Sequence, residues 1–409
     1  MRSNYKNIGD FIKRVDVRNE DLNTSTLLGV NLKKEFMPSV ANTIGTDLSK
    51  YKVITKGQFG CKLMSVGRDK MLPISRLKKY DKAIMSSAYF VFEVINSNEL
   101  APEYLFMWFK RSESDRFLWF LSGGDVRGRI TWEDLCSLPI KVPPIDEQRS
   151  IVAEYQTVTD RIQLNEQINT KLEETAQALY RHWFVDFEFP DENGEPFKSS
   201  GGKMLWNEKL EKNIPEEWEP ISIKEFTREM KSGGTPNRGV DEYWNSNDIP
   251  WLKTGELKNK VIIDSQEYIS EIGLAESSAK LLPLNSVLVA MYGQGNTKGQ
   301  IGYLRTESST NQACCSMQCS NEKQSSYLYY YLRENRDEIV SVAIGGAQPN
   351  LSKEIIENLV ILNPPSQVLE KHCFVDILNK REFLYREEQK LNSLKDLILS
   401  KMATNNSLS

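Results

Sequence analysis

GDVRGRITWEDLCSLPIKVPP, at residues 124–144, and GGAQPNLSKEIIENLVILNPP, at residues 345–365, are two versions of one pattern in this 409-residue chain. They align without a gap at an offset of 221 residues, so that Ile130 meets Leu351, Glu133 meets Glu354 and the paired prolines coincide. Repeats of roughly 20 to 50 residues are typical of solenoids. This much longer period indicates two domains of one design, each followed by a helix.

Each copy of the pattern leads into a helix with apolar residues at heptad spacing. The seam residues are Ile151, Tyr155, Val158, Ile162, Asn165, Asn169, Leu172 and Leu179 in the first helix, and Ile377, Leu384, Leu391 and Ile398 in the second. Such spacing is typical of a coiled coil, in which polar residues such as Asn165 and Asn169 fix the register and lower stability. We predict that the two helices, each roughly 35 to 40 residues long, pair antiparallel. The alternative is that each helix packs only on its own domain.

The class predicted for the whole chain is α+β, because both globular segments mix β-like runs with helical patterns. We expect a first recognition-type domain at 1–143, a first helix at 144–186, a turn-rich connector at 187–213, a second domain at 214–363, a second helix at 364–402 and a flexible tail at 403–409. Each domain has about 150 residues, an ordinary size for one core.

The formal net charge of −4 is unevenly distributed along the chain. Residues 1–142 carry 23 Lys and Arg against 16 Asp and Glu, whereas residues 200–363 carry 17 against 22. Affinity for a polyanion depends on locally clustered cations. The first domain can therefore meet phosphate unaided, and the second needs a local basic patch or a basic partner.

Cysteine and histidine usage limits the possible chemistry. The six cysteines show no CxxC pairing and nothing at the start of the chain resembles a signal peptide, so we expect reduced thiols and a cytoplasmic protein. No stretch has the roughly 18 apolar residues that a membrane span needs. With two histidines, both in helical patterns, we predict neither a metal site nor catalytic residues in this chain.

Two motifs that suggest catalysis fail on inspection. Asn363-Pro-Pro-Ser366 resembles the N/D-P-P-Y/F loop of amino-methyltransferases, but Ser366 stands where the base-stacking aromatic would be and no glycine-rich loop for the methyl donor follows a strand. The loop Gly293–Gly299 lacks the order of a P-loop. Its glycines could instead let the backbone approach a nucleic-acid strand, with a plain hairpin turn as the alternative.

Basic and amide side chains provide candidates for DNA contact, since exposed cations bind phosphate and Arg, Lys, Asn or Gln read base edges. The candidates are Arg68, Lys70, Arg76, Lys78 and Lys79 in the first domain, and Arg238, Lys253, Lys258, Gln294, Asn296 and Lys298 in the second. Either set could also be merely a solvated face.

Several of these stretches, taken in order, resemble the specificity subunit of type I restriction–modification systems. They are VGRDKMLPISRL at 66–77, AIMSSAYFVF at 83–92, PPIDEQRSIV at 143–152, ALYRHWFVDF at 178–187, IPEEW at 214–218, SGGTP at 232–236 with IPW at 249–251, and GGAQPNLS at 345–352. The match spans nearly the whole chain. The second helix departs from it, starting with PPSQVLE at 364–370.

The resemblance implies two target-recognition domains, each recognising one half of a split, asymmetric sequence in double-stranded DNA. It also implies an antiparallel helix pair that spaces them and docks two modification subunits, which bind S-adenosylmethionine and methylate adenine. Restriction subunits that use ATP and Mg²⁺ would join them, so this chain would bind no cofactor itself. The alternatives are a coiled-coil adaptor that binds only proteins and a stand-alone adenine methyltransferase.

Overall fold

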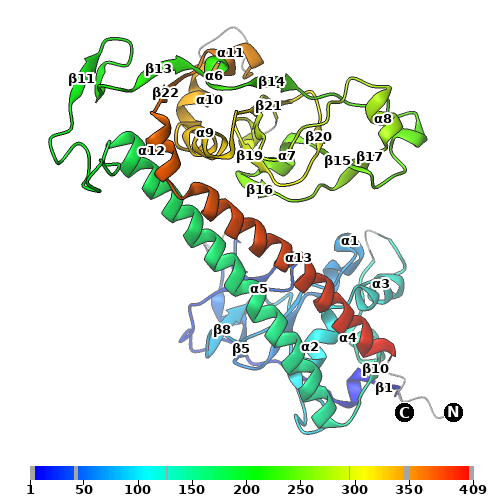
Figure 1. The fold of residues 1–409 in the computed structure, drawn as a ribbon. Coiled ribbons are helices and arrows are strands. Elements are labelled where there is room, and N and C mark those ends of the chain that lie inside the picture. Colours follow the sequence, from blue (N-terminus) through cyan, green and yellow to red (C-terminus); the bar gives the residue numbers. More distant parts are fainter. Residues whose placement is uncertain (1–4, 41–44, 126–127, 294, 345–349, 405–409) are drawn as a thin grey trace. The chain divides into compact units, whose positions relative to one another are not determined.

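The computed structural model describes the chain except for residues 1–4, 41–44, 126–127, 294, 345–349 and 405–409. It divides into two compact units (Figure 1): the first comprises Met1–Ile162 with Lys390–Ser409, and the second comprises Gln163–Gln389. Within the described residues, no helix has both the length and the apolar character needed to cross a membrane.

An antiparallel sheet of four strands, in the order β2-β9-β6-β7, forms the centre of the first unit. Phe59 of β6 stacks on Phe92 of β9 with ring centroids 4.9 Å apart, and Phe109 of α2 meets Phe92 edge-on, so α2 closes the core over this face. The elements are β1 (Tyr5–Asn7), η1 (Ile8–Asp10), β2 (Ile12–Val15), β3 (Leu28–Val30), β4 (Phe36–Pro38), η2 (Leu48–Lys50), β5 (Lys52–Thr55), β6 (Phe59–Cys61), η3 (Leu63–Ser65), α1 (Val66–Asp69), β7 (Ile74–Arg76), β8 (Lys82–Met85), β9 (Phe90–Val94), α2 (Pro102–Lys110), α3 (Ser112–Leu121), α4 (Trp132–Cys136) and β10 (Pro139–Lys141).

The second unit is built around a five-stranded sheet in the order β14-β21-β18-β19-β16, with a smaller sheet β17-β15-β20. Tyr303 of β19 and Tyr329 of α9 pack edge to face with centroids 5.5 Å apart, so α9 covers the larger sheet. The elements are β11 (Met204–Asn207), β12 (Lys212–Pro215), β13 (Glu219–Ser222), α6 (Ile223–Phe226), β14 (Glu229–Ser232), η5 (Asp241–Tyr243), β15 (Ile249–Leu252), α7 (Thr254–Leu257), β16 (Lys260–Ile262), β17 (Glu267–Ile269), α8 (Glu271–Ala275), β18 (Val287–Ala290), η6 (Gly295–Thr297), β19 (Ile301–Leu304), β20 (Ser309–Thr310), β21 (Cys314–Gln318), α9 (Glu322–Glu334), α10 (Arg336–Ile344), α11 (Lys353–Asn358) and β22 (Val360–Asn363).

The two units share one topology, which confirms the prediction of two domains of one design. The strand order β2-β9-β6-β7 matches β14-β21-β18-β19, and the pair β1–β10 matches β13–β22. The helices correspond as well, α2 and α3 to α9 and α10, and α4 to α11. The repeat also explains a shared helix start: Thr131 caps α4 and Ser352, 221 positions later, caps α11 through the same side-chain bond.

The long helices α5 (Ile145–Tyr180) and α13 (Phe374–Thr404) run antiparallel. Contacts within the second unit show the direction, because Asn165 meets Glu387 whereas Glu173, further along α5, meets Arg381, earlier on α13. The predicted antiparallel coiled coil is therefore confirmed. At 1.5 Å per residue, the 36 residues of α5 span about 54 Å.

The start of α5 is fixed to the first unit by Gln148, which is fully buried. Its amide nitrogen donates to the carbonyl oxygens of Glu99 and Pro143, each at 2.8 Å, and its amide oxygen accepts from the backbone nitrogen of Ala101. In the second unit the corresponding position holds Leu369, which packs in the core instead. The two helix starts therefore differ in sequence because the first is held by a polar residue, Gln148, and the second by an apolar one, Leu369.

The second helix is not continuous, contrary to the single helix expected from residue 364 onward. A short α12 (Ser366–Lys371) ends at His372, whose backbone is extended, and α13 begins two residues later. Lys323 of α9 holds this break, since its ammonium group donates to the carbonyl oxygens of Glu370 and His372 at 2.9 and 2.7 Å. The buried His372 ring also stacks on Phe374 at 4.6 Å. The heptad spacing does not reveal these tertiary contacts.

Candidate nucleic-acid interface

In the first unit, the loop between β6 and β7 (residues 62–73) presents two of the predicted DNA-contact residues. Arg68 and Lys70 are both exposed. Arg68 is paired with Asp69 at 2.7 Å, and Lys70, which adopts a left-handed backbone conformation, lies 5.5 Å over the ring of Trp119 on α3. At Gly67 the loop lies so close to the backbone of Asp125 and Gly128 that a side chain would collide with their carbonyl oxygens.

The other three residues of the first basic run have different environments. Lys78 and Lys79 are exposed beyond the end of β7, with Lys79 lying 5.6 Å over the ring of Tyr80. Arg76 is instead used inside the domain, where its side chain is 15% exposed and bonds to the Glu103 carboxylate at 2.6 Å and the Gly57 carbonyl at 3.1 Å. The structure therefore gives Arg76 a packing role in the free chain.

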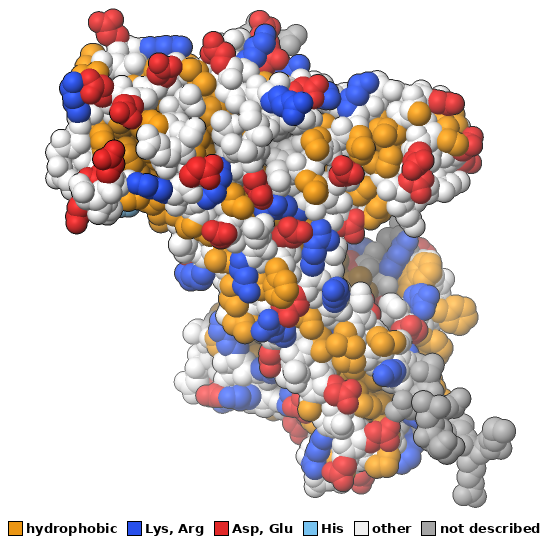
Figure 2. Space-filling view, viewed as in Figure 1, with side chains coloured by type: hydrophobic (Ala, Val, Ile, Leu, Met, Phe, Trp, Pro, Cys, Tyr) orange, Lys and Arg blue, Asp and Glu red, His pale blue; other side chains and the backbone are white. Residues whose placement is uncertain are grey.

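Beside the β6–β7 loop, α3 exposes two aromatic side chains that the sequence analysis missed. Phe117 is 41% exposed and Phe120 is 75% exposed, and Arg116 on the same helix is exposed as well. Figure 2 shows hydrophobic side chains gathered over α3. Exposed aromatics next to cations are suited to contact with nucleic-acid bases. The spacing of Phe117 and Phe120, three positions apart with the buried Leu118 between them, is the signal that could have indicated this surface.

In the second unit, the loop between β18 and β19 (residues 291–300) occupies the corresponding place. Asn296 is exposed and Lys298 is half-buried, and Gln294 lies outside the described residues. Gly299 has a positive φ of 72°, and a side chain there would collide with Val340 of α10. The loop is therefore seated closely on that helix.

Arg238 and Lys253 lie together at a different place in the second unit. The Arg238 guanidinium is 3.5 Å from the ring centroid of Trp244 and 2.6 Å from the Glu267 carboxylate, which also pairs with Lys253. Burial alone would raise the pKa of Glu267, but the bonds from Lys253 and Arg238 hold it below its ordinary value. One carboxylate thus offsets part of the charge of two half-exposed cations. Lys258 is exposed at the end of α7, in a left-handed conformation.

Basic and acidic side chains are interspersed on the face shown in Figure 2. The structure brings Arg68 and Lys70 together on one loop, and Arg238 and Lys253 on another surface. Arg76 is instead bonded to Glu103 and Gly57 within the first unit.

The predicted helix seam is apolar in the first unit. Tyr155, Val158 and Ile162 of α5 are buried in the same core as Ile398 of α13, and Ile151 and Leu391 pack against it.

In the second unit the seam begins with two buried asparagines. Asn165 donates to the Glu387 carboxylate at 2.7 Å, whereas neither polar atom of the Asn169 side chain has a partner among the described residues. The apolar seam residues of this unit are Leu172, Leu179, Ile377 and Leu384, of which Ile377 and Leu384 are buried and the other two half-buried.

One turn beyond Asn169, Glu173 ties three helices together. Its carboxylate pairs with Arg333 of α9 at 2.5 Å and with Arg381 of α13. All three side chains are nearly enclosed, with exposures of 14%, 13% and 3% respectively. This node fixes the rotation of α5 relative to α9 and α13 within the second unit.

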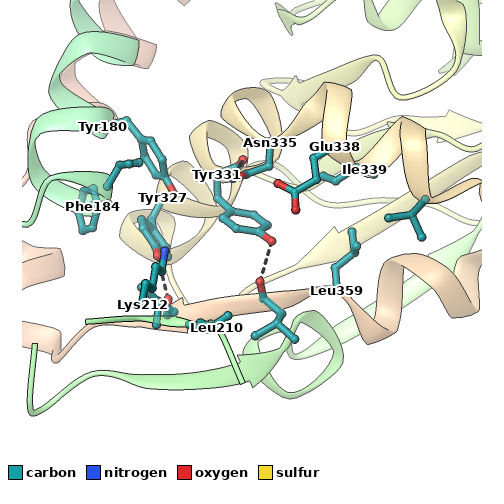
Figure 3. Close-up of a pocket in the computed structure, with 14 residues that line it drawn as sticks. Tyr180, Phe184, Leu210, Lys212, Tyr327, Tyr331, Asn335, Glu338, Ile339 and Leu359 are labelled. Atoms are coloured by element: carbon teal, nitrogen blue, oxygen red, sulfur yellow. Dashed lines mark hydrogen bonds between the residues drawn. The ribbon is translucent and has the colours of Figure 1, made fainter. Parts of the chain in front are cut away.

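A cavity of about 340 Å³ in the second unit lies beside the end of α5 and is lined by Tyr180, Tyr327 and Tyr331 (Figure 3). Two of the hydroxyls are already used to hold β22, because Tyr327 donates to the Leu362 carbonyl at 2.8 Å and Tyr331 donates to the Val360 carbonyl at 2.7 Å. The cavity therefore belongs to the joint between helix and domain. Within the described residues, no cluster of His, Cys, Asp or Glu could hold a metal ion.

The buried thiols belong to the domain cores. Burial raises the pKa of the core residue Cys315 to about 12, and it does the same for the partly buried Cys319, which packs against that core.

Comparison with known proteins identifies this architecture. The chain is 26% identical over 313 residues to the type I restriction enzyme MjaIX specificity subunit of Methanocaldococcus jannaschii, covering 76% of this chain and 70% of that protein. It is 24% identical over 376 residues to the HindI specificity subunit of Haemophilus influenzae, covering 79% and 81%. The crystal structure of a type I restriction–modification S subunit from M. genitalium has the same fold, with a TM-score of 0.61 at 14% identity over 97% and 95% of the two chains. The family model of the type I restriction modification DNA specificity domain matches twice, at residues 6–174 and 215–395, and the chain belongs to this family.

Proposed function

We propose that this chain is the DNA-recognition subunit of a type I restriction–modification complex, in which each unit recognises one half of a bipartite site. The observation that carries the proposal is that the two units share one topology but have different loops at the equivalent position. The β6–β7 loop offers Arg68 and Lys70, and the β18–β19 loop offers Asn296 and Lys298. Different side chains on equivalent loops select different bases, so the two half-sites differ and the whole site is asymmetric.

The helices α5 and α13 supply the second part of the proposal. They set the number of unread base pairs between the half-sites and dock two modification subunits that methylate adenine. Those subunits hold S-adenosylmethionine, and the restriction subunits that join them use ATP and Mg²⁺. This chain contributes recognition without a cofactor of its own, and the complex works in the cytoplasm, where its DNA is.

Sequencing of methylated bases in cells that carry the cognate modification subunit, with and without this chain, tests the recognition role. We expect a split adenine-methylated motif only when the chain is present. Absence of any motif, despite a stable complex with that subunit, would favour an adaptor that binds only proteins. Methyl transfer by the purified chain alone would instead favour a stand-alone methyltransferase.

Removal of one heptad from each helix at facing positions tests the spacing role. Seven residues correspond to about 10 Å of helix, or about 3 base pairs at 3.4 Å each. The heptad phase and the antiparallel register are both kept. We expect the methylated motif to keep both half-sites and to lose about 3 base pairs of spacer, and an unchanged spacer would contradict the idea that the helices set it.

A further inference from the structure

Two residues at the same position of the repeat hold the two candidate recognition loops. Asp115 lies on α3 and Arg336 begins α10, and they are separated by the repeat offset of 221 residues. Each side chain reaches from the helix to the backbone of the neighbouring loop. The two residues carry opposite charges, so the two domains hold equivalent loops with an acidic side chain in one and a basic side chain in the other.

In the first unit the anchor is a carboxylate. One oxygen of Asp115 accepts a hydrogen bond from the backbone nitrogen of Leu72, in the β6–β7 loop, at 3.0 Å. The other oxygen pairs at 2.7 Å with the ammonium group of Lys34, whose side chain is 7% exposed. Asp115 itself is 15% exposed. Both of its oxygens are thus committed inside the protein.

In the second unit the anchor is a guanidinium. Arg336 donates to the carbonyl oxygens of Gly299, Asn296 and Lys298, at 3.1, 3.0 and 2.9 Å. Its side chain is 23% exposed. An arginine presents five donors in a fixed planar fork, so one side chain holds three carbonyls of one turn in a defined geometry. The loop that carries Asn296 and Lys298 is therefore fixed through its own backbone.

From this equivalence we infer that Asp115 and Arg336 are positioning residues for recognition, each governing one half of the bipartite site. The inference rests on the proposed function, because it assumes that the two loops contact DNA. Neither anchor needs to touch DNA, since each is bonded within the protein: Asp115 to Leu72 and Lys34, and Arg336 to three loop carbonyls and Asp337. Each acts by holding the contact-making side chains of its loop in place, and misplacement by about 1 Å can cost on the order of 100-fold in a positioned reaction.

The test compares Arg336→Met with Asp115→Asn in the complex with the cognate modification subunit. Methionine keeps an apolar stem against the loop but removes all donors. Asparagine keeps an acceptor for Leu72 and avoids leaving Lys34 beside an apolar side chain. Arg336→Lys, which restores the positive charge and a single donating ammonium group in place of the planar guanidinium, serves as partial rescue. The matched control is Glu338→Gln, because Glu338 is an exposed acidic residue on the same helix, two positions after Arg336.

Methylation rates are measured on three duplexes: the full site, the site with the first half altered, and the site with the second half altered. We expect Arg336→Met to lose roughly 10- to 100-fold of its discrimination in one half and to keep it in the other. Asp115→Asn should do the reverse, and Glu338→Gln should match the unaltered chain. Thermal unfolding and complex formation are followed in parallel, since a merely structural defect affects both halves together.

The inference would be overturned if both variants discriminated in both halves as well as the unaltered chain does. It would also be overturned if each variant lost discrimination equally in both halves. These outcomes differ from failure of the proposed function, in which the unaltered chain itself shows no preference for a bipartite site.

Discussion

Glu173→Gln tests the claim that one carboxylate holds α5 to α9 and α13. In the native chain this carboxylate faces two arginines whose side chains are 13% and 3% exposed. The substitution keeps the size of the side chain and its ability to accept a hydrogen bond, but it removes the negative charge. Two nearly enclosed cations are then left without a compensating charge.

The expected loss follows from the other bonds of the two arginines. Breaking a buried ion pair by removing one partner costs about 3 to 5 kcal/mol. Arg333 keeps bonds to the Asn259 carbonyl at 2.7 Å and the Tyr329 hydroxyl at 3.1 Å, whereas the Nε atom of Arg381 already lacks a partner within the described part of the chain. We therefore expect the lower end, about 3 kcal/mol. For a unit of this size that corresponds to a fall in Tm of about 6 to 12 °C.

Urea and thermal unfolding of the full chain measure the effect. The control is Glu174→Gln, because Glu174 is the next residue, is 58% exposed and pairs with Lys171 on the surface. We expect this control to change the free energy of unfolding by less than about 0.5 kcal/mol. A loss below about 1 kcal/mol in Glu173→Gln, or equal losses in both variants, would refute the reasoning.

Three further predictions concern pH, packing and charge. Burial, reinforced by nearby Lys323, lowers the pKa of His372 to about 4 from 6.5. The stability contributed by the neutral ring should be fully present above about pH 6.5, and it should fall by up to about 3 kcal/mol as the pH drops toward 4. Urea unfolding at several pH values should show this loss in the native chain and not in His372→Phe. Asn169→Leu should raise the free energy of unfolding by about 1 to 2 kcal/mol, because neither atom of the amide group has a partner in the part of the chain that the structure describes. Asn165→Leu, which breaks a bond to a carboxylate, should show no such gain. Glu267→Gln should strengthen binding of the assembled complex to non-specific DNA and steepen its salt dependence, measured by titration at several salt concentrations; an unchanged slope would show that the two cations it pairs with do not meet phosphate.

The parts of the fold that repeat were predictable from the sequence. The 221-residue offset indicated two domains with one topology, and heptad spacing indicated the antiparallel helices. Both signals are periodic and depend on many residues, so no single substitution hides them. The N-caps Thr131 and Ser352 could be predicted for a similar reason, because a hydroxyl residue and its capping geometry recur at the same position of the repeat.

The features that escaped prediction depend on contacts between distant segments. Arg76 belongs to a basic run, yet the run does not show that Glu103 and Gly57 hold its guanidinium inside the domain. The break between α12 and α13 depends on Lys323, which lies 49 positions before His372 in the chain. Periodicity carries no information about such pairs.

Asp115 and Arg336 show how a duplicated domain can diverge in specificity without a change of topology. The sheet order fixes where the β6–β7 and β18–β19 loops emerge, and the helix beside each loop offers one position from which a side chain reaches its backbone. A loop that presents an amide hydrogen there needs a carboxylate, and a loop that presents carbonyls needs a guanidinium. Exchange of one recognition loop alone would place the wrong charge against the new backbone. A recognition loop and its anchor must therefore change together, and transplanting the β18–β19 loop into another member of the family should succeed only when Arg336 is transferred with it.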